Sequence, residues 1–210
     1  MSTPTESPAA PAVADPAPLG LAGFALTTFL LSAVNAHWAT SSSGLDWLGY
    51  AFAYGGLCQL LAGMWEFKNK NVFGATAFST YGGFWIGLYF YIHDVVLGGL
   101  AKGLQVNRDL GWILLAFAIF NTYMLIISTQ VNMAVFLVFL TLELTEIFLF
   151  IGQFTITASD AGTDALIKVG GVIGVITALV AWYTSAAGVI NGVKGKHVFP
   201  VGKPLFDMGG

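Results

Sequence analysis

The chain has 210 residues, of which 56% are hydrophobic and 9% are charged, and its formal net charge is −3. An average soluble domain is about 25% charged, so this chain has too few charges to cover a water-exposed surface, and part of its solvent must be lipid. The small net charge and the lack of a basic patch argue against nucleic-acid binding. The single cysteine excludes a disulfide framework or a cysteine–metal site.

Residues 1–14 are rich in Pro, Ala, Ser and Thr, and they carry Glu6 but no Lys or Arg. A secretory signal begins with a basic segment, which this stretch lacks. Its apolar content is also too low for a packed structure. We therefore expect a disordered N-terminal tail.

Six apolar segments follow the tail, and each has about the 20 residues that an α-helix needs to cross a bilayer. They cover residues 19–39, 47–65, 72–93, 110–129, 133–154 and 169–190, and nearly all charged residues lie between them or in the tails. A spanning segment must satisfy its own backbone polar groups. The sequence therefore predicts an all-α membrane protein with six transmembrane helices in one bundle, residues 15–191, followed by a C-terminal tail, residues 192–210.

Lys and Arg residues are unevenly divided between the two sides of this topology. An even number of spans places both tails on one side, which carries Lys68, Lys70, Lys194, Lys196 and Lys203. The opposite side carries Lys102, Arg108 and Lys168. Because cytoplasmic loops are enriched in Lys and Arg, we expect cytoplasmic tails and a multi-pass protein of the plasma or inner membrane.

Glycine is abundant, with 26 residues, and it recurs at intervals of four in two segments. Gly83 and Gly87 lie in the third segment, and Gly170 and Gly174 lie in the sixth. Small residues let membrane helices approach closely. The spacing fits either packing within one bundle or an interface between subunits, and both interpretations stay open.

The first helix is preceded by a distinctive string, Asp15-Pro16-Ala17-Pro18-Leu19-Gly20-Leu21. An N-cap role for Asp and a first-turn role for Pro explain its first two residues, but not the whole string. It resembles the NPAPLGL signature of the acetate uptake transporter family, which includes bacterial acetate–succinate permeases and fungal acetate transporters. Asp15 replaces the signature Asn, which keeps the capping role and adds a charge. Residues 59–66, QLLAGMWE, and residues 71–85, NVFGATAFSTYGGFW, resemble further blocks of the same family.

The resemblance covers roughly residues 15–191 and implies a fold and a function. The implied fold is a six-helix protomer with an internal path, assembled into a hexamer that resembles acetate and urea channels. The implied function is transport of acetate, and also of succinate, by proton coupling or as a channel, without a cofactor. The resemblance further implies a narrow apolar constriction made by Phe24, Tyr81 and Leu142, and an influence of Ala181 on substrate size.

The polar residues of the first two segments allow two interpretations. A bare carboxylate cannot cross hydrocarbon because its desolvation is costly, so an apolar neck needs polar groups nearby, and the Tyr81 hydroxyl offers one donor. Phe24, Thr28 and Asn35 fall on one face of a helical wheel. Asn35 and Gln59 either line the path or join helices by hydrogen bonds, and Thr28 can instead bond its own backbone. Glu66 follows the second segment, close to Lys68, and we expect it to serve as a structural cap or ion pair.

Two glutamates, Glu143 and Glu146, lie within the otherwise apolar fifth segment. Intramembrane carboxylates are costly and are functional candidates for that reason. Glu146 shares a helix face with Leu142, four residues earlier, whereas Glu143 points about 100° away, toward a neighbouring helix or subunit. The sequence supports the hypothesis that Glu146 couples proton movement to carboxylate movement. The alternative is a buried, protonated glutamate that bonds a neighbour.

Two other functions compete with carboxylate transport. The first is a urea or amide channel, which uses similar six-helix protomers, although the family blocks argue against it. The second is a membrane sensor or scaffold that transports nothing. We expect no enzyme, no cofactor and no bound metal, because the sequence has no nucleophile–base set, metal-ligand cluster or Gly-rich phosphate loop.

Overall fold

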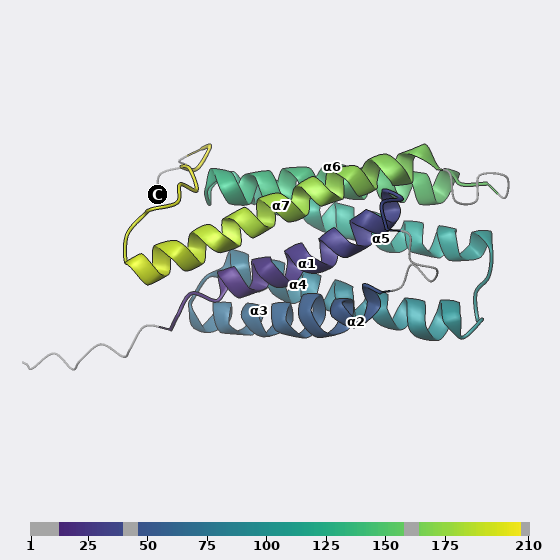
Figure 1. Ribbon diagram of the computed structural model, residues 1–210, viewed down its shortest axis with the longest axis horizontal. Helices are drawn as coiled ribbons and strands as arrows, with labels where there is room; N and C mark the ends of the chain where they lie inside the picture. The colour runs from purple at the N-terminus through teal and green to yellow at the C-terminus, as the bar shows by residue number, and fades with distance from the viewer. Residues whose placement is uncertain (1–12, 40–45, 158–163, 207–210) are drawn as a thin grey trace, which may run out of the picture.

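The computed structural model describes residues 13–39, 46–157 and 164–206, and within these ranges all regular structure is helical. Figure 1 shows the long helices lying along one axis of the molecule. In chain order the elements, with η for π-helix, are α1 (Ala17–Asn35), α2 (Leu48–Tyr50), η1 (Ala51–Cys58), α3 (Gln59–Lys68), α4 (Val72–Phe90), η2 (Tyr91–Leu97), α5 (Leu104–Ser128), α6 (Met133–Thr155) and α7 (Ala165–Lys194). The predicted N-terminal tail lies outside the described residues except for Val13 and Ala14.

Each predicted apolar segment falls on these helices. The elements α2, η1 and α3 follow one another without a break from Leu48 to Lys68, and η2 continues α4 to Leu97. Four helices, α1, α5, α6 and α7, are long and apolar enough to cross a membrane by length and composition. The two helical stretches with π-helical segments are not among these four. The all-α fold is confirmed, and the count of six spans stays a prediction.

The start of α1 and the end of α7 follow from local sequence. Pro16 occupies the N-cap position of α1, and Asp15 Oδ1 accepts a hydrogen bond of 2.9 Å from the backbone N of Ala17. Asp15 therefore accepts a hydrogen bond from the first turn of α1, although it lies one residue before the N-cap position. At the other end of the chain, α7 continues to Lys194, beyond the predicted segment, and Gly195 adopts a left-handed conformation with φ of +62°. Glycine takes this conformation without steric cost, which is why it commonly ends helices.

The two pairs of spaced glycines have different surroundings. A Cβ added at Gly174 would collide with Ser32 of α1, and one added at Gly170 would collide with side chains of α6. This pair packs within the bundle. Gly83 and Gly87 of α4, in contrast, are exposed and have no atom within 4 Å of an added Cβ. Packing inside one protomer does not explain the second pair.

After α7 the chain folds back onto the bundle instead of leaving it. We call residues 195–206 the C-terminal strap. Asn191 of α7 holds its first part, because Asn191 Oδ1 accepts hydrogen bonds of 2.7 and 2.9 Å from the backbone N atoms of Val198 and Phe199. The Asn191 amide also donates to the Phe199 carbonyl at 2.9 Å. One side chain therefore clamps two residues of the strap.

The later part of the strap crosses to α6 and α5. The Val201 carbonyl accepts a hydrogen bond of 2.9 Å from the backbone N of Ala134, in the first turn of α6. The backbone N of Leu205 donates to the Thr129 carbonyl at 2.8 Å, just after the end of α5. The strap thus runs across one end of the bundle, from α7 to the corner between α5 and α6.

Candidate functional site

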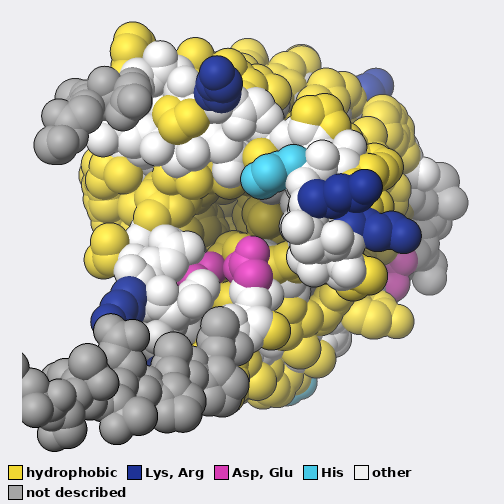
Figure 2. Space-filling view, turned by 90° about the vertical axis from the view of Figure 1, so that its left-hand side faces the viewer, with side chains coloured by type: hydrophobic (Ala, Val, Ile, Leu, Met, Phe, Trp, Pro, Cys, Tyr) yellow, Lys and Arg dark blue, Asp and Glu magenta, His cyan; other side chains and the backbone are white. Residues whose placement is uncertain are grey.

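A cavity of about 560 Å³ opens at the end of the bundle where α1 begins and α7 ends. We call this opening the tail-side mouth. Helices α1, α3, α4, α6 and α7 and the C-terminal strap all contribute to the cavity wall. Figure 2 looks at this end of the molecule and shows a hollow with an apolar interior, with acidic side chains on one side and histidine and lysine side chains on the other.

The cavity ends at the three residues that the family resemblance assigns to a constriction. Phe24, Tyr81 and Leu142 are buried in one apolar cluster, and on its own helix each is the lining residue furthest from the mouth. The rings of Phe24 and Tyr81 meet edge to face, with centroids 5.7 Å apart. Leu142 lies nine residues into α6 from Met133, so the cavity reaches about 14 Å into the bundle. Ala181 belongs to the same cluster but does not line the cavity.

The other polar residues singled out from the sequence divide into two groups. Gln59 and Glu66 line the cavity, and each is almost fully buried with one side-chain oxygen that has no hydrogen-bond partner. Thr28 and Asn35 do not line it. Thr28 is buried one turn beyond Phe24 and its hydroxyl has no partner, whereas Asn35 is half-buried at the last residue of α1.

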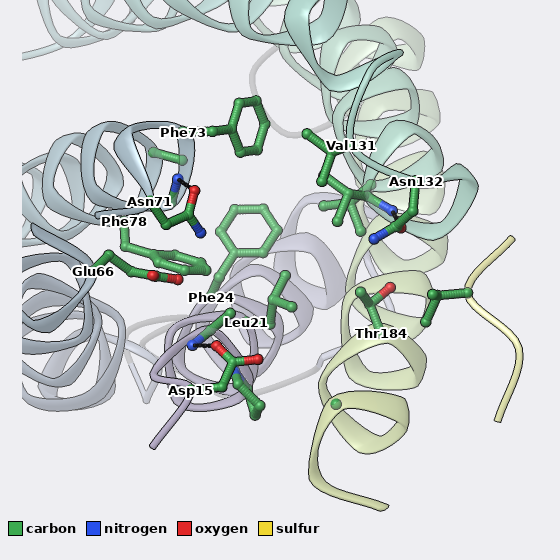
Figure 3. Close-up of a pocket in the computed structure, with 18 of the residues that line it drawn as sticks. Asp15, Leu21, Phe24, Glu66, Asn71, Phe73, Phe78, Val131, Asn132 and Thr184 are labelled. Atoms are coloured by element: carbon green, nitrogen blue, oxygen red, sulfur yellow. Dashed lines mark hydrogen bonds between the residues drawn. The ribbon is translucent and has the colours of Figure 1, made fainter. Parts of the chain in front are cut away.

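Glu66 bonds a polar neighbour at the end of α3. Its Oε2 accepts a hydrogen bond of 3.4 Å from the Asn69 side chain, and within the described ranges no ion pair joins it to Lys68. Figure 3 shows Glu66, Asn71 and Asp15 on one side of the cavity and Asn132 and Thr184 on the other. Glu66 therefore faces the cavity and not the outer surface.

The signature residues 15–21 lie at one side of the mouth. Gly20 lies against the ring of Phe78, and Leu19 faces outward with 45% exposure. The Pro18 carbonyl accepts a hydrogen bond of 2.7 Å from the Ser185 hydroxyl of α7. The signature residues that line the cavity are Asp15, Ala17, Pro18 and Leu21.

Behind Tyr81, a hydrogen-bond network joins α4, α5 and α6. The Tyr81 hydroxyl lies 3.0 Å from Asn121 Oδ1 and 3.3 Å from Glu146 Oε1. The Asn121 amide donates to Glu143 Oε2 at 2.7 Å and to the Phe139 carbonyl at 3.0 Å. Both glutamates of α6 thus belong to one network, with Asn121 at its centre.

Asn121 is the member of this network that sequence reasoning missed. It is fully buried, and it is a lone amide in the apolar segment 110–129, which is the signal that drew attention to Asn35 in the first segment. Glu143 points toward α5, where it also accepts a hydrogen bond of 2.8 Å from the Thr122 hydroxyl. The sequence left two directions possible for Glu143, toward a neighbouring helix or toward a neighbouring subunit. Its hydrogen bonds are to α5, a neighbouring helix of the same protomer.

Long apolar helices around a cavity that ends at an apolar neck define an integral, multi-pass membrane protein. Within that class, the chain belongs to the GPR1/FUN34/yaaH family, whose model matches residues 2–203. The membership confirms the resemblance drawn from the signature and its accompanying blocks.

Similar proteins are known from fungi and bacteria. The chain is 40% identical over 197 residues to acetate permease A of Emericella nidulans, which covers 90% of this chain and 65% of the permease. It thus spans less than two thirds of the length of that fungal relative. It is 34% identical over 191 residues to the succinate-acetate/proton symporter SatP of Escherichia coli K12, which covers 91% of this chain and 96% of the symporter.

A solved structure of the bacterial acetate channel SatP has the same fold. It matches with a TM-score of 0.80 and 34% sequence identity, covering 90% of this chain and 99% of the channel. The helical arrangement described above is therefore that of a known membrane channel.

Proposed function

We propose that this chain transports small monocarboxylates such as acetate, and also succinate, through a path within each protomer. The observation that carries the proposal is the cavity that opens at the tail-side mouth and ends where Phe24, Tyr81 and Leu142 meet. The names of the fungal permease and of the bacterial symporter and channel support the substrate class. The same names also favour transport, and not catalysis, as the activity of this chain.

The neck suits selection of a small acid. A short apolar constriction controls passage by size and by excluding water, and the apolar parts of Phe24 and Leu142 supply such a surface. The Tyr81 hydroxyl adds one polar group at the same level, which can bond a carboxylate or a carboxylic acid as it passes. An acid that crosses in its neutral form avoids most of the desolvation cost of the anion.

The network behind Tyr81 supports a role for Glu146 in moving a proton. The Asn121 amide hydrogens are directed to Glu143 and to a carbonyl, so Asn121 Oδ1 accepts the single Tyr81 hydroxyl proton. The Tyr81 hydroxyl is also placed to donate to Glu146 Oε1 at 3.3 Å. While its single proton bonds Asn121, a protonated Glu146 can instead donate to the Tyr81 oxygen. We therefore propose that Glu146 alternates between a protonated state bonded to Tyr81 and a state that has released its proton.

Orientation and assembly complete the proposal. The excess of Lys on the tail side favours cytoplasmic tails, which would make the tail-side mouth the cytoplasmic end of the path. The exposed Gly83 and Gly87 give α4 a surface on which another helix can approach closely. This supports assembly of protomers, and we expect the hexamer that the family resemblance implies.

Flux measurements with purified protein in liposomes test the function. Wild-type protein should admit acetate faster than urea, and Leu142→Ala should admit bulkier acids such as lactate because it widens the neck. Leu144→Ala is a matched control, since Leu144 lies on the same helix but is 42% exposed and does not line the cavity. Faster flux of urea than of acetate would favour an amide channel, and a lack of any flux would favour a sensor or scaffold.

A further inference from the structure

The two sides of the tail-side mouth differ in charge. Asp15, which precedes α1, and Glu66 of α3 contribute carboxyl groups to the cavity wall, whereas the C-terminal strap contributes Lys196 and His197. A carboxylate anion is repelled by the Asp15 carboxylate on the first side and attracted by the Lys196 ammonium group on the second, whereas burial raises the pKa of Glu66 and favours its neutral form. An anion that enters the cavity should therefore follow the strap.

The strap presents its basic residues from a fixed position. Lys196 and His197 lie between Gly195, where α7 ends, and the two residues that Asn191 clamps. The backbone is thus held on both sides of the pair. Although the side chains are exposed, each starts from a defined point on the rim.

Unused hydrogen-bond donors line the same cavity. Within the described part of the chain, no acidic side chain pairs with Lys196 or His197. Asn132, which also lines the cavity, uses its Oδ1 to cap α6 by accepting a hydrogen bond of 2.9 Å from the backbone N of Val135. Its amide hydrogens are left to donate. A carboxylate has two oxygens and can accept from an ammonium and an amide group together.

We propose that Lys196 and His197, together with Asn132, form a binding site for small carboxylate anions at the tail-side mouth. The site would hold an anion by charge before the neck selects it by size. The ligand class of this site rests on the proposed function, because the transported carboxylate would bind at this site and then pass through the neck. The proposed site also gives the C-terminal strap a role in transport, because the strap is held beside the cavity by its hydrogen bonds to the bundle.

Acetate binding to the purified protein tests the site directly, by saturation-transfer difference NMR in detergent. Lys196→Gln should raise the dissociation constant about two- to fivefold, the range expected for one partly exposed ion pair, and Lys196→Arg should restore it. The control is Lys194→Gln, which removes the same charge two residues away, from an exposed side chain that does not line the cavity. Equal affinities in Lys196→Gln and Lys194→Gln would overturn the proposal.

Acetate exchange in proteoliposomes separates this site from the function on which it rests. Equal acetate concentrations on both sides expose the mouth to substrate whichever way the protein is inserted. Lys196→Gln should raise KM about two- to fivefold with an unchanged maximal rate, and high salt should shrink the difference because it screens exposed charges. Exchange with an unchanged KM would refute the site and leave the function intact. Binding that depends on Lys196 without any exchange would refute the function and leave the site, and a wild-type protein that does not bind acetate would refute both.

Discussion

Helix α7 meets α1 through small residues that let the two backbones touch, whereas α5 meets α6 through hydrogen bonds that join the buried Asn121 and the exposed Thr122 to Glu143. Lipid offers helices no hydrophobic reason to associate, so packing and interhelical hydrogen bonds must hold them together. The two interfaces use these two means in different proportions, since the contact between α7 and α1 adds the bond from Ser185 to the Pro18 carbonyl to its close packing. The small residues between α7 and α1 carry no ionisable groups. The carboxyl groups able to move a proton, Glu143 and Glu146, therefore lie at the polar interface next to Tyr81.

Gly171→Val should have the largest effect, because it attacks the close contact between α7 and α1. A Cβ at Gly171 would lie 2.7 Å from the carbonyl carbon of Asn35 and 2.8 Å from the carbonyl oxygen of Ser32. These are backbone atoms that cannot rotate away, so we expect a loss of about 3 kcal/mol of stability. Thermal unfolding in detergent measures it. Gly192→Val is the control, since Gly192 lies on the same helix and an added Cβ there meets open space; an equal loss in both variants would mean that the contact is not the cause.

Asn121→Ala should have the next largest effect, because it removes the centre of the polar interface. The buried Tyr81 hydroxyl would lose a partner, which costs about 1–3 kcal/mol for a buried unsatisfied group, and the part-buried Glu143 Oε2 would lose one bond at a smaller cost. Thr122→Val removes one hydrogen bond of Glu143 and leaves Tyr81 untouched, so its loss should be smaller. The same unfolding measurement ranks the variants. Wild-type stability in Asn121→Ala would show that hydrogen bonds do not hold α5 against α6.

Glu146→Gln should barely change stability but should change transport. Glutamine keeps a donor for the Tyr81 hydroxyl, as the protonated glutamate does, and removes the ability to release a proton. Acetate flux into proteoliposomes, with and without an inward proton gradient, should then lose most of its response to the gradient. Glu143→Gln is the matched control and should keep that response. If flux and its pH dependence were unchanged in Glu146→Gln, the coupling role would be abandoned.

The sequence reveals the apolar helices, and the family resemblance indicates the neck residues, but neither reveals the partners of the polar groups. Runs of apolar residues locate the helices because a bilayer demands length and hydrophobicity together. The family resemblance points to Phe24, Tyr81 and Leu142, which the fold brings to one cluster. The partner of Glu143 depends on how α5 is rotated against α6, which residue spacing within α6 cannot reveal. Asn121 was missed for that reason.

The C-terminal strap was also beyond prediction from local patterns. Gly195 signals that α7 ends there, and the residues after it have the composition of a tail. The fold-back depends on backbone hydrogen bonds to distant residues, such as that between Val201 and Ala134. Because any residue except proline can donate such a bond, no side-chain signal marks the partner.

The two ends of the described chain have different consequences for attaching a reporter protein. At the N-terminal end, Asp15 precedes α1 and lines the opening of the cavity. A fluorescent protein fused to that end is therefore attached through a segment that reaches the opening. At the C-terminal end, Leu205 is bonded to Thr129 beside α5, so a fusion there departs from the flank of the bundle. C-terminal fusions are accordingly the better choice for imaging or purification when activity must be preserved.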